Sequence, residues 1–471
     1  MSRSMSMRGR AVSALVVLLV VAAACSNAKK GGGAIDTGGG GAVTTYAGSD
    51  FSTHQTVSAP GVTDTEIRVG SIVSKTNPLG TDMNEFNKGL QAYLDYVDAK
   101  GGVWGRKIKL VSQRDDQTAN NATEADALLS QDNVYAAFVA VELFTGAPKL
   151  AAAGIPTFGW NINAEWQGPE NFFPNVAPIC FNQCSPFQHV APWMAQKVHA
   201  AKVGVLAYAV PQSASCGKGI SSAFKEFGND VGAHVAFADT SLQFGQTDYS
   251  AQVSKMKAAG VDFLVSCMDY NGDFAVAKEM VKQGIRDKVT FMHPNMYDQD
   301  FVKANARYFS GDLVVTSGVV AFEHQPQPAS VKQFISYAKA HDVKILELSA
   351  QGWVAGMQFV SALKAAGPNF TWKNLVQAWN TTTWYTADGW VPPTDWSRQH
   401  GNPGDPAHAP RFECTNVVRV QPNGDFKGVW DDHGKPWVCW DGANRDQWYQ
   451  PVNVRFDTDK PFTFKDAQRQ G

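Results

Sequence analysis

The chain has 471 residues, of which 44% are hydrophobic and 18% are charged, with 41 basic residues against 43 acidic ones. These values are typical of a globular protein too long for a single core, so two lobes or domains are expected. The slight acidic excess argues against nucleic acid as a partner and against a broad basic membrane-binding face.

Residues 1–24 have the composition of an export signal. Arg3, Arg8 and Arg10 precede an uncharged run over 11–24, which is shorter than the roughly 20 residues that span a bilayer. Small residues lead into Cys25, so the segment resembles a bacterial lipoprotein signal with Cys25 as the acylated residue. The alternative is an ordinary secretory signal with an incidental cysteine. We therefore expect an exported protein, lipid-anchored to the outer face of the bacterial cytoplasmic membrane.

Residues 25–60 are predicted to form a disordered Gly-rich tether. Glycine runs at 31–33 and 38–41 lie among Ala, Thr and Ser, and such a segment buries too little apolar surface to offset its chain entropy. A flexible coil of this length has a reach of roughly 30 Å. The folded body is predicted to begin at Gly61, and no later stretch is long and apolar enough to cross a bilayer.

From residue 65 onward, short β-rich runs alternate with helical stretches, which predicts a parallel sheet with helices on both faces. The first set of strands is predicted at 66–73, 107–112, 134–141 and 155–159, and its helices at 83–99, 123–131 and 147–153. An irregular segment follows over 161–185. This first set predicts one Rossmann-like lobe.

The same alternation then restarts and predicts a second lobe. Its strands are predicted at 202–208, 234–238, 263–266, 290–293 and 313–317, and its helices at 186–200, 219–231, 249–259 and 272–283. Helical stretches at 351–366 and 374–379 are predicted to return to the first lobe. A β-hairpin with strands at 417–420 and 426–429 is predicted around Pro422-Asn423-Gly424. The expected organisation is 61–178 plus about 318–380 for lobe 1, 179–317 plus about 381–430 for lobe 2, and 431–471 as a Trp-rich extension.

Six cysteines remain once Cys25 is set aside, and an even number in an oxidising compartment favours disulfides. Cys414 and Cys439 stand apart from the rest and are expected to pair. The connectivity of the other four is left open by their spacing; they are Cys180, Cys184, Cys216 and Cys267. A zinc site using Cys180, Cys184 and His189 lacks a second paired knuckle, so no metal or cofactor is expected.

Three segments resemble the leucine/isoleucine/valine-type substrate-binding proteins of ABC transporters. They are GGVWGRKIKL at 101–110 followed by DDQ at 115–117, GVTDTEI at 61–67, and GQTDYSA at 245–251. The resemblance runs from about residue 61 to about residue 429. It implies an α/β fold of the type I periplasmic binding protein kind, with two Rossmann-like lobes of parallel sheet joined by a three-crossover hinge and a small ligand trapped as the lobes close.

The resemblance also implies that ligand contacts come from loops after successive strands. In this sequence those loops are 74–80, 142–146 and 159–163 in the first lobe, and 211–217, 268–271 and 293–297 in the second. The candidate ligand-binding residues are Asn77, Glu142, Phe144, Thr145, Gly159, Trp160, Asn161, Ser215, Asp269, Tyr270 and Tyr297. Trp160 and Tyr297 could instead pack at the lobe edge. Thr145, with the amide of Gly146, could hold a carboxylate or act as a plain N-cap.

The sequence departs from the family pattern at three places that bear on the ligand. Amino-acid binders carry an acid where alignment puts Gly272, with Asp269 and Asp273 as neighbours. The family's aromatic-Gly-x-Gly step reads CGKG at 216–219, and its serine-rich loop reads ELFT at 142–145. A branched-chain amino acid is therefore not assured. Because Cys216 and Cys267 both fall at strand ends facing the expected cleft, we expect them to pair, which leaves Cys180 with Cys184.

The competing class is an exported enzyme. Ser-x-x-Lys occurs at 254–257 and 361–364, but both matches lie on helical stretches without the companion motifs of penicillin-binding enzymes. We therefore expect a lipid-anchored, monomeric solute-binding component of an ABC importer, not an enzyme, whose partners are a small amino-acid-like or amide-like solute and the permease subunits. The alternatives are a ligand sensor of the same fold and an enzyme with an unrecognised site.

Overall fold

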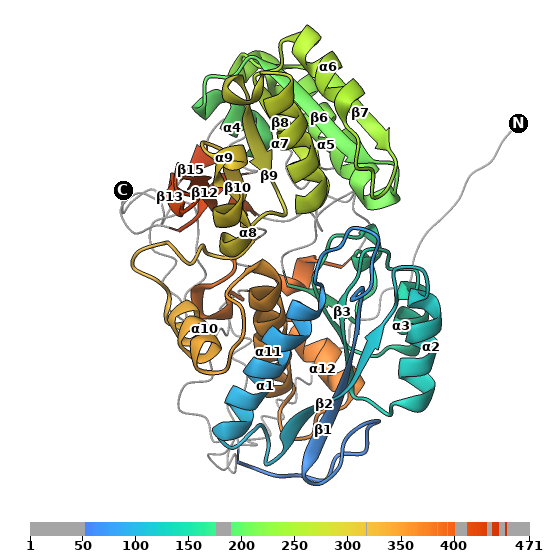
Figure 1. Cartoon of the computed structure of the whole chain (residues 1–471). Helices are drawn as coiled ribbons and strands as arrows, with labels where there is room; N and C mark the ends of the chain where they lie inside the picture. The colour runs from blue at the N-terminus through green and yellow to red at the C-terminus, as the bar shows by residue number, and fades with distance from the viewer. Residues whose placement is uncertain are drawn as a thin grey trace, which may run out of the picture.

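The computed structural model describes residues 52–175, 190–316, 318–383, 385–392, 394–400, 412–430, 436–441 and 448–449. Two bodies lie one above the other, and each is built around one sheet (Figure 1). We call them the first lobe and the second lobe, after the first and second sheets. Among the residues that the structure describes, the chain changes lobe between β5 and α4, between β10 and α10, and before β12.

The first sheet has five parallel strands in the order β2-β1-β3-β4-β5. Alternate residues of β3 enter different cores: Phe138 joins the cluster under α1 and α11, whereas Val139 joins the cluster under α2 and α3. Both faces are covered, which explains the continuous apolar run of β3. The bounds are β1 (Glu66–Val73), β2 (Lys107–Asp115), β3 (Ala136–Ala140), β4 (Thr157–Gly159), β5 (Phe172–Pro174), α1 (Asn84–Ala99), α2 (Asn121–Gln131), α3 (Ala147–Ala153) and α11 (Glu347–Ala366).

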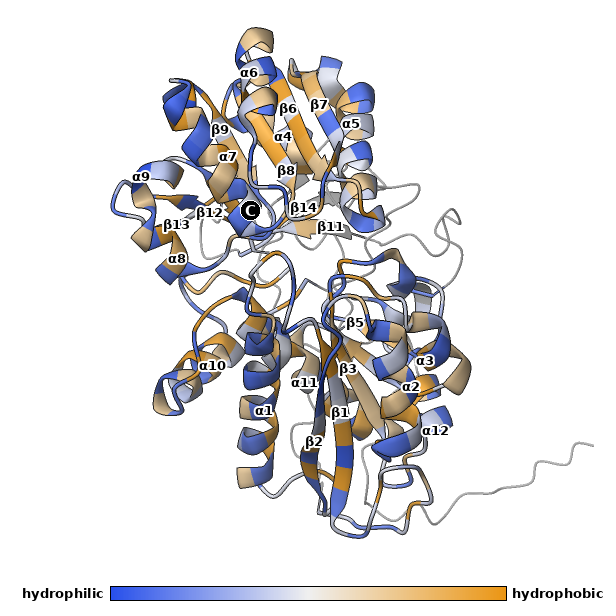
Figure 2. Ribbon diagram, turned by 45° about the vertical axis from the view of Figure 1, so that its right-hand side comes forward, coloured by the Kyte–Doolittle hydropathy of each residue, from blue (hydrophilic) through white to orange (hydrophobic). Residues whose placement is uncertain are grey.

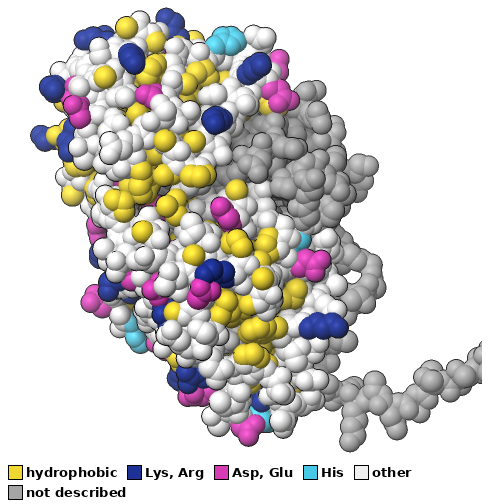
Figure 3. Space-filling view, turned by 90° about the vertical axis from the view of Figure 1, so that its right-hand side faces the viewer, with side chains coloured by type: hydrophobic (Ala, Val, Ile, Leu, Met, Phe, Trp, Pro, Cys, Tyr) yellow, Lys and Arg dark blue, Asp and Glu magenta, His cyan; other side chains and the backbone are white. Residues whose placement is uncertain are grey.

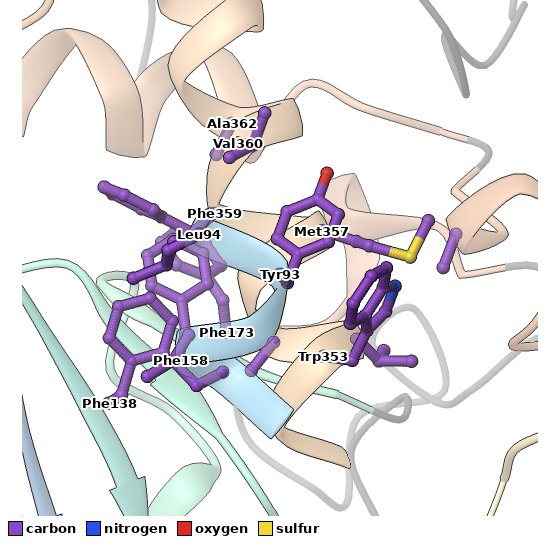
Figure 4. Close-up of a cluster of buried hydrophobic side chains, with 14 of the residues drawn as sticks. Tyr93, Leu94, Phe138, Phe158, Phe173, Trp353, Met357, Phe359, Val360 and Ala362 are labelled. Carbon is purple, nitrogen blue, oxygen red and sulfur yellow. The ribbon is translucent and has the colours of Figure 1, made fainter. Parts of the chain in front are cut away.

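Helices α1 and α11 cross in backbone contact. A Cβ atom at Gly352 would lie 1.9 Å from the carbonyl oxygen of Phe86, and one at Gly89 would lie 1.9 Å from that of Ser349. Only glycine permits this approach. Aromatic side chains fill the space where the two helices meet the sheet (Figure 4), so the crossing joins a late segment of the chain to an early one.

The second sheet has seven strands in the order β13-β12-β10-β9-β8-β6-β7. Five are parallel, and the hairpin β12–β13 adds to β10 in the antiparallel sense. Val205 joins the cluster under α4 and α5, and Leu206 joins the cluster under α6 and α7, so β6 is hydrophobic along most of its length (Figure 2). The bounds are β6 (Lys202–Tyr208), β7 (His234–Leu242), β8 (Phe263–Cys267), β9 (Thr290–His293), β10 (Leu313–Val315), β12 (Val417–Val420), β13 (Phe426–Val429), α4 (Val190–Lys197), α5 (Pro211–Val231), α6 (Ser250–Ala259), α7 (Tyr270–Lys282), α8 (Gln299–Ala304) and α9 (Ala306–Phe309).

The parallel strands of both lobes follow the 2-1-3-4-5 order of a doubly wound α/β sheet. The predicted fold of two Rossmann-like lobes is therefore confirmed. The one difference is that the hairpin makes the second sheet mixed.

The chain returns to the first lobe after β10, and it stays there longer than predicted. Helices α10 (Ala329–Ala340) and α12 (Trp372–Trp379) pack in the first-lobe core with α11. Tyr385, Trp390 and Trp396 belong to the same core and are at most 1% exposed, whereas 381–430 was expected in the second lobe. These aromatic side chains are buried in apolar surroundings beside α11. Within 381–430, the part that joins the second sheet is the hairpin.

The folded body reaches back at least to Ser52, whereas the tether was predicted to run to residue 60. Val57 is buried in the first-lobe core. The carbonyl oxygen of Gln55 accepts a hydrogen bond of 2.7 Å from Nη2 of Arg106. Because Arg106 is 1% exposed, its guanidinium needs such internal acceptors, and this need holds the segment in place.

Six predicted elements are confirmed to the residue: 66–73, 147–153, 202–208, 290–293, 417–420 and 426–429. Helix α5 is a correction, because it begins at Pro211 and not at residue 219, so the loop expected over 211–217 is helical. Proline at the first helical position has a suitable φ and lacks only an N–H that would have no partner there. Strand β5 and helix α10 were not predicted.

The cysteine predictions have different outcomes. Cys216 and Cys267 form the predicted disulfide. Cys414 is disulfide-bonded, and the pairing of β11 (Phe412–Thr415) with β14 (Val438–Asp441) places Cys439 directly opposite it; β15 (Trp448–Tyr449) completes this small sheet. Cys180 and Cys184 lie outside the described residues, as do residues 1–51. Within the described ranges, no helix combines the length and apolarity of a membrane span.

Candidate ligand site between the lobes

Each sheet has one place where consecutive connections leave in opposite directions, and ligands of such sheets bind there, beyond the carboxyl ends of the strands. In the first lobe this place lies between β1 and β3, and in the second it lies between β6 and β8. The segments that follow these strands are 74–82, 141–146 and the starts of α5 and α7. The topology alone therefore indicates four short segments as candidates for ligand contact.

The four segments meet across the boundary between the lobes. Nε2 of Gln212, in the first turn of α5, donates a hydrogen bond of 2.6 Å to the carbonyl oxygen of Glu142. Nδ2 of Asn271, in the first turn of α7, donates one of 2.8 Å to the carbonyl oxygen of Leu79. Each contact joins a loop of the first lobe to a helix start of the second.

Two buried acids face this boundary, one from each lobe. Glu142 is 6% exposed and Asp269 is 9% exposed. Burial raises the pKa of Glu142 to about 8, with further contributions from the negative charges of Asp269 and Asp116, while the hydroxyl of Thr81 opposes the rise. Burial also raises the pKa of Asp269. The charges that act on the pKa of Glu142 are those of two acids, so a positively charged group placed here would be stabilised.

Tyr208 holds Asp269 in place, and Tyr249 lies beside the Tyr208 hydroxyl. The hydroxyl of Tyr208, the last residue of β6, donates a hydrogen bond of 2.7 Å to Oδ2 of Asp269. The hydroxyl of Tyr249 lies 3.4 Å from that of Tyr208. Oδ1 of Asp269 accepts from the amides of Asn271 and Gly272, which makes Asp269 the N-cap of α7. The carboxylate is therefore fixed in orientation by both of its oxygens.

Gly272 explains why the acid stands at residue 269. A Cβ atom at Gly272 would lie 2.3 Å from the hydroxyl oxygen of Tyr208, so the tyrosine occupies the space that a side chain would need. Position 272 is where the resemblance expects the ligand-facing acid. The carboxylate of Asp269, three residues earlier, stands beside that same space.

Residues 66–425 match the family model described as periplasmic binding protein. The chain belongs to this family. Among curated relatives, Leu/Ile/Val-binding protein homolog 7 of Brucella abortus is 26% identical over 243 residues, which cover 49% of this chain. The chain spans only 58% of the length of that relative.

Solved structures of other periplasmic binding proteins share the fold. A fatty acid ABC transporter substrate-binding protein from Thermomonospora curvata has a TM-score of 0.63 and 18% identity, covering 79% of this chain and 93% of that one. A branched-chain amino acid ABC transporter from Thermus thermophilus with bound valine has a TM-score of 0.63 and 14% identity, with 77% and 95% covered. A solute binding protein from R. palustris in complex with benzoate has a TM-score of 0.59 and 16% identity, with 77% and 95% covered. At these identities the likeness concerns the fold alone.

The structure of this periplasmic binding protein brings some of the predicted ligand residues to the lobe boundary. Glu142 and Asp269 lie there, and Tyr270 follows Asp269 directly at the start of α7. Burial raises the pKa of Tyr270 to about 12, and its ring packs on Phe301 with centroids 4.7 Å apart. Asn77 lies in the same region but organises its own loop: its Nδ2 donates to the carbonyl oxygens of Ser74 and Thr81, each at 2.8 Å.

Three other predicted residues lie in packed cores. Phe144 is 1% exposed and stacks on Phe172 with centroids 5.6 Å apart. Gly159 has φ of +152°, and a Cβ there would lie 2.0 Å from the carbonyl oxygen of Val139; its absence of a side chain is therefore needed for sheet packing. The hydroxyl of Tyr297 donates to Oε2 of Glu323 at 2.6 Å.

The remaining four residues differ in exposure. Thr145 is exposed, and the amide of Gly146 already donates to Oδ1 of Asn121 at 2.7 Å, so that amide is not available to hold a carboxylate. Trp160 is 9% exposed in the first-lobe core, and Asn161 beside it is 3% exposed. Ser215 lies half-buried in the first turns of α5.

The tyrosines were missed because Tyr208 and Tyr249 fall inside a predicted strand (202–208) and a predicted helix (249–259), outside the loops that the resemblance selects. The usable signal was the position of Tyr208 at a strand end next to the β6–β8 switch point. Within the described ranges no cluster of His, Cys, Asp or Glu is placed to hold a metal ion. Basic and acidic side chains are interspersed on the face drawn in Figure 3, without one extended patch of a single sign.

Proposed function

We propose that this periplasmic binding protein is the extracytoplasmic solute-binding component of an ABC importer and that it does not act as an enzyme. It captures a small amino-acid-like or amide-like solute between its lobes and delivers it to a permease. A lipid anchor at Cys25 keeps the protein close to that partner and raises their effective concentration.

The observation that carries the proposal is the meeting of the switch-point segments of both sheets, with a buried acid from each lobe. A solute enclosed there touches both lobes, so the closed form gains contacts that neither lobe offers alone. Glu142 and Asp269 lie in a region where burial strengthens electrostatic interactions, and they favour an ammonium or amide N–H group over an anion.

The named relatives are consistent with solute binding and differ in what their names say they bind. Their names and titles refer to Leu/Ile/Val, fatty acid, valine and benzoate. The shared fold thus supports the class of function, and the residues of this chain must select the solute. Asp269, Glu142 and Tyr208 are the residues that we propose make this selection.

The test is a thermal-shift panel of amino acids, amides, urea and aromatic acids on the wild type and on Asp269→Asn. A solute at 100 times its Kd stabilises the folded state by about 2.7 kcal/mol. Asparagine is as good an N-cap as aspartate, so Asp269→Asn should keep the unliganded melting temperature while losing at least about tenfold in affinity.

Asp395→Asn is the matched control, because Asp395 also accepts a backbone N–H, that of Ser397 at 3.1 Å, in a segment packed on the first-lobe core. It should bind like the wild type. Failure of every solute class to stabilise the wild type, or turnover of a stabilising compound, would contradict the proposed function.

A further inference from the structure

One side chain of the first lobe is buried in a core of the second. Leu79, which follows β1 in the loop 74–82, is 8% exposed. It belongs to a cluster whose other members all lie between Leu206 and Phe291, including Tyr208, Tyr249 and Met268. Leu79 is the one residue from the first lobe in that cluster among the residues that the structure describes.

Polar contacts fix the loop on both sides of Leu79. Its carbonyl oxygen accepts from Nδ2 of Asn271, and Pro78 lies against the second lobe at Gly245, where a Cβ would be 3.5 Å from the Pro78 carbonyl oxygen. Within the first lobe, Oδ1 of Asn77 accepts from the amide of Leu79 at 3.1 Å. The loop is thus preorganised by its own lobe and presents an apolar side chain to the other.

We propose that Leu79 is a latch: a positioning residue that stabilises the closed arrangement of the lobes through a contact between the lobes themselves. The closed form then exists in the ligand-free protein, and the apparent affinity for any solute depends on that population, since the apparent Kd equals the intrinsic Kd divided by the competent fraction. The predicted effect of Leu79 on the affinity for a solute, which is the affinity component, rests on the proposed function. The ligand-free component does not.

The experiment measures lobe closure without any solute. Spin labels are placed on cysteines introduced at Lys88 in α1 and Lys255 in α6, two exposed positions on different lobes, and the distance distribution is recorded by pulsed electron resonance. Burial of a leucine side chain is strongly favourable, so Leu79→Ala should lower the closed-to-open ratio about tenfold. Asn271→Ala, which removes one hydrogen bond, should lower it about threefold, and Leu79→Met, which conserves volume, should restore most of it.

Leu129→Ala is the matched control. Leu129 is a half-buried leucine of α2 in the first lobe, and it packs against the cluster between the first sheet and helices α2 and α3. It should leave the ratio within twofold of the wild type. A wild type with no closed population, a Leu79→Ala ratio within twofold of the wild type, or an equal fall in Leu129→Ala would each overturn the latch.

Where the solute panel yields a ligand, Leu79→Ala should raise its Kd by the same factor as it lowers the closed fraction, and by that same factor for every ligand. A factor that varies from ligand to ligand would show a direct ligand contact and contradict the latch. A panel without any ligand contradicts the proposed function and leaves the spin-label result to decide on Leu79.

Discussion

The two lobes share a strand order but are stabilised by different kinds of interaction. The first-lobe core gathers aromatic side chains from distant segments, among them Trp353, Trp390, Trp396 and Trp437, each at most 1% exposed. In the second lobe the Cys216–Cys267 disulfide ties α5 to the end of β8. The first-lobe core thus includes many residues from late in the sequence, whereas the second lobe is cross-linked within itself.

The second lobe also contains a buried chain of charges. Nδ1 of His293 lies 2.8 Å from Oδ2 of Asp273, and its Nε2 lies 2.9 Å from Oδ2 of Asp312. Arg286 pairs with Asp312 at 2.5 Å. These groups join α7, β9 and the segment before β10. Buried polar pairs thus connect elements of the second lobe, as aromatic packing connects elements of the first. The comparison predicts that the two lobes respond to different perturbations.

The largest expected effect is on the first lobe. Gly352→Val should destabilise it by more than about 4 kcal/mol, because the backbone of Phe86 already occupies the place of a side chain at residue 352. Denaturant unfolding followed by tryptophan fluorescence measures the loss. Ser336→Val, which puts the same β-branched residue at an exposed position on α10, is the control and should cost less than about 1 kcal/mol.

The next effect is confined to the second lobe. Replacing both Cys216 and Cys267 by serine should lower stability by about 4 kcal/mol, since the bridge closes a loop with a sequence separation of 51. Hydrogen exchange should quicken in β6 to β9 and stay unchanged in β1 to β4. Equal loosening of both lobes would contradict a separate stabilisation of the second.

A smaller effect should come from pH. Pairing with Asp273 and Asp312 raises the pKa of His293 against the opposing effect of burial. Its contribution to stability is therefore complete below its ordinary pKa of 6.5 and is lost as the pH rises through the folded-state value. Second-lobe exchange should quicken as the pH is raised through the folded-state pKa of His293, after correction for intrinsic exchange. Since no tryptophan core is involved, first-lobe fluorescence should not change.

Sequence patterns could predict what depends on local order. Strand β6 and helix α3 were predicted to the residue because buried β-branched runs and alanine-rich stretches leave little ambiguity. Helix α5 was predicted to begin at residue 219, which is too late, and the resemblance implied a ligand loop over 211–217. Gly217 instead lets the helix pack on the sheet, where its Cβ would lie 2.8 Å from that of Ala207.

The site was predictable only where position along a strand decides it. Glu142 and Asp269 became candidates because the resemblance implies ligand contacts from the loops after successive strands, and both lie at the lobe boundary. Phe144 and Tyr297 satisfied the same rule, yet their rings pack into cores, and this depends on side-chain direction, which no spacing encodes. Leu79 was missed because the side chains that bury it belong to the other lobe.

Hydrogen exchange with and without the most stabilising solute tests solute capture between the lobes most directly. We expect added protection in four places together: 74–82, the residues after β3, and the first turns of α5 and α7. Protection in one lobe alone, or away from these segments, would contradict it.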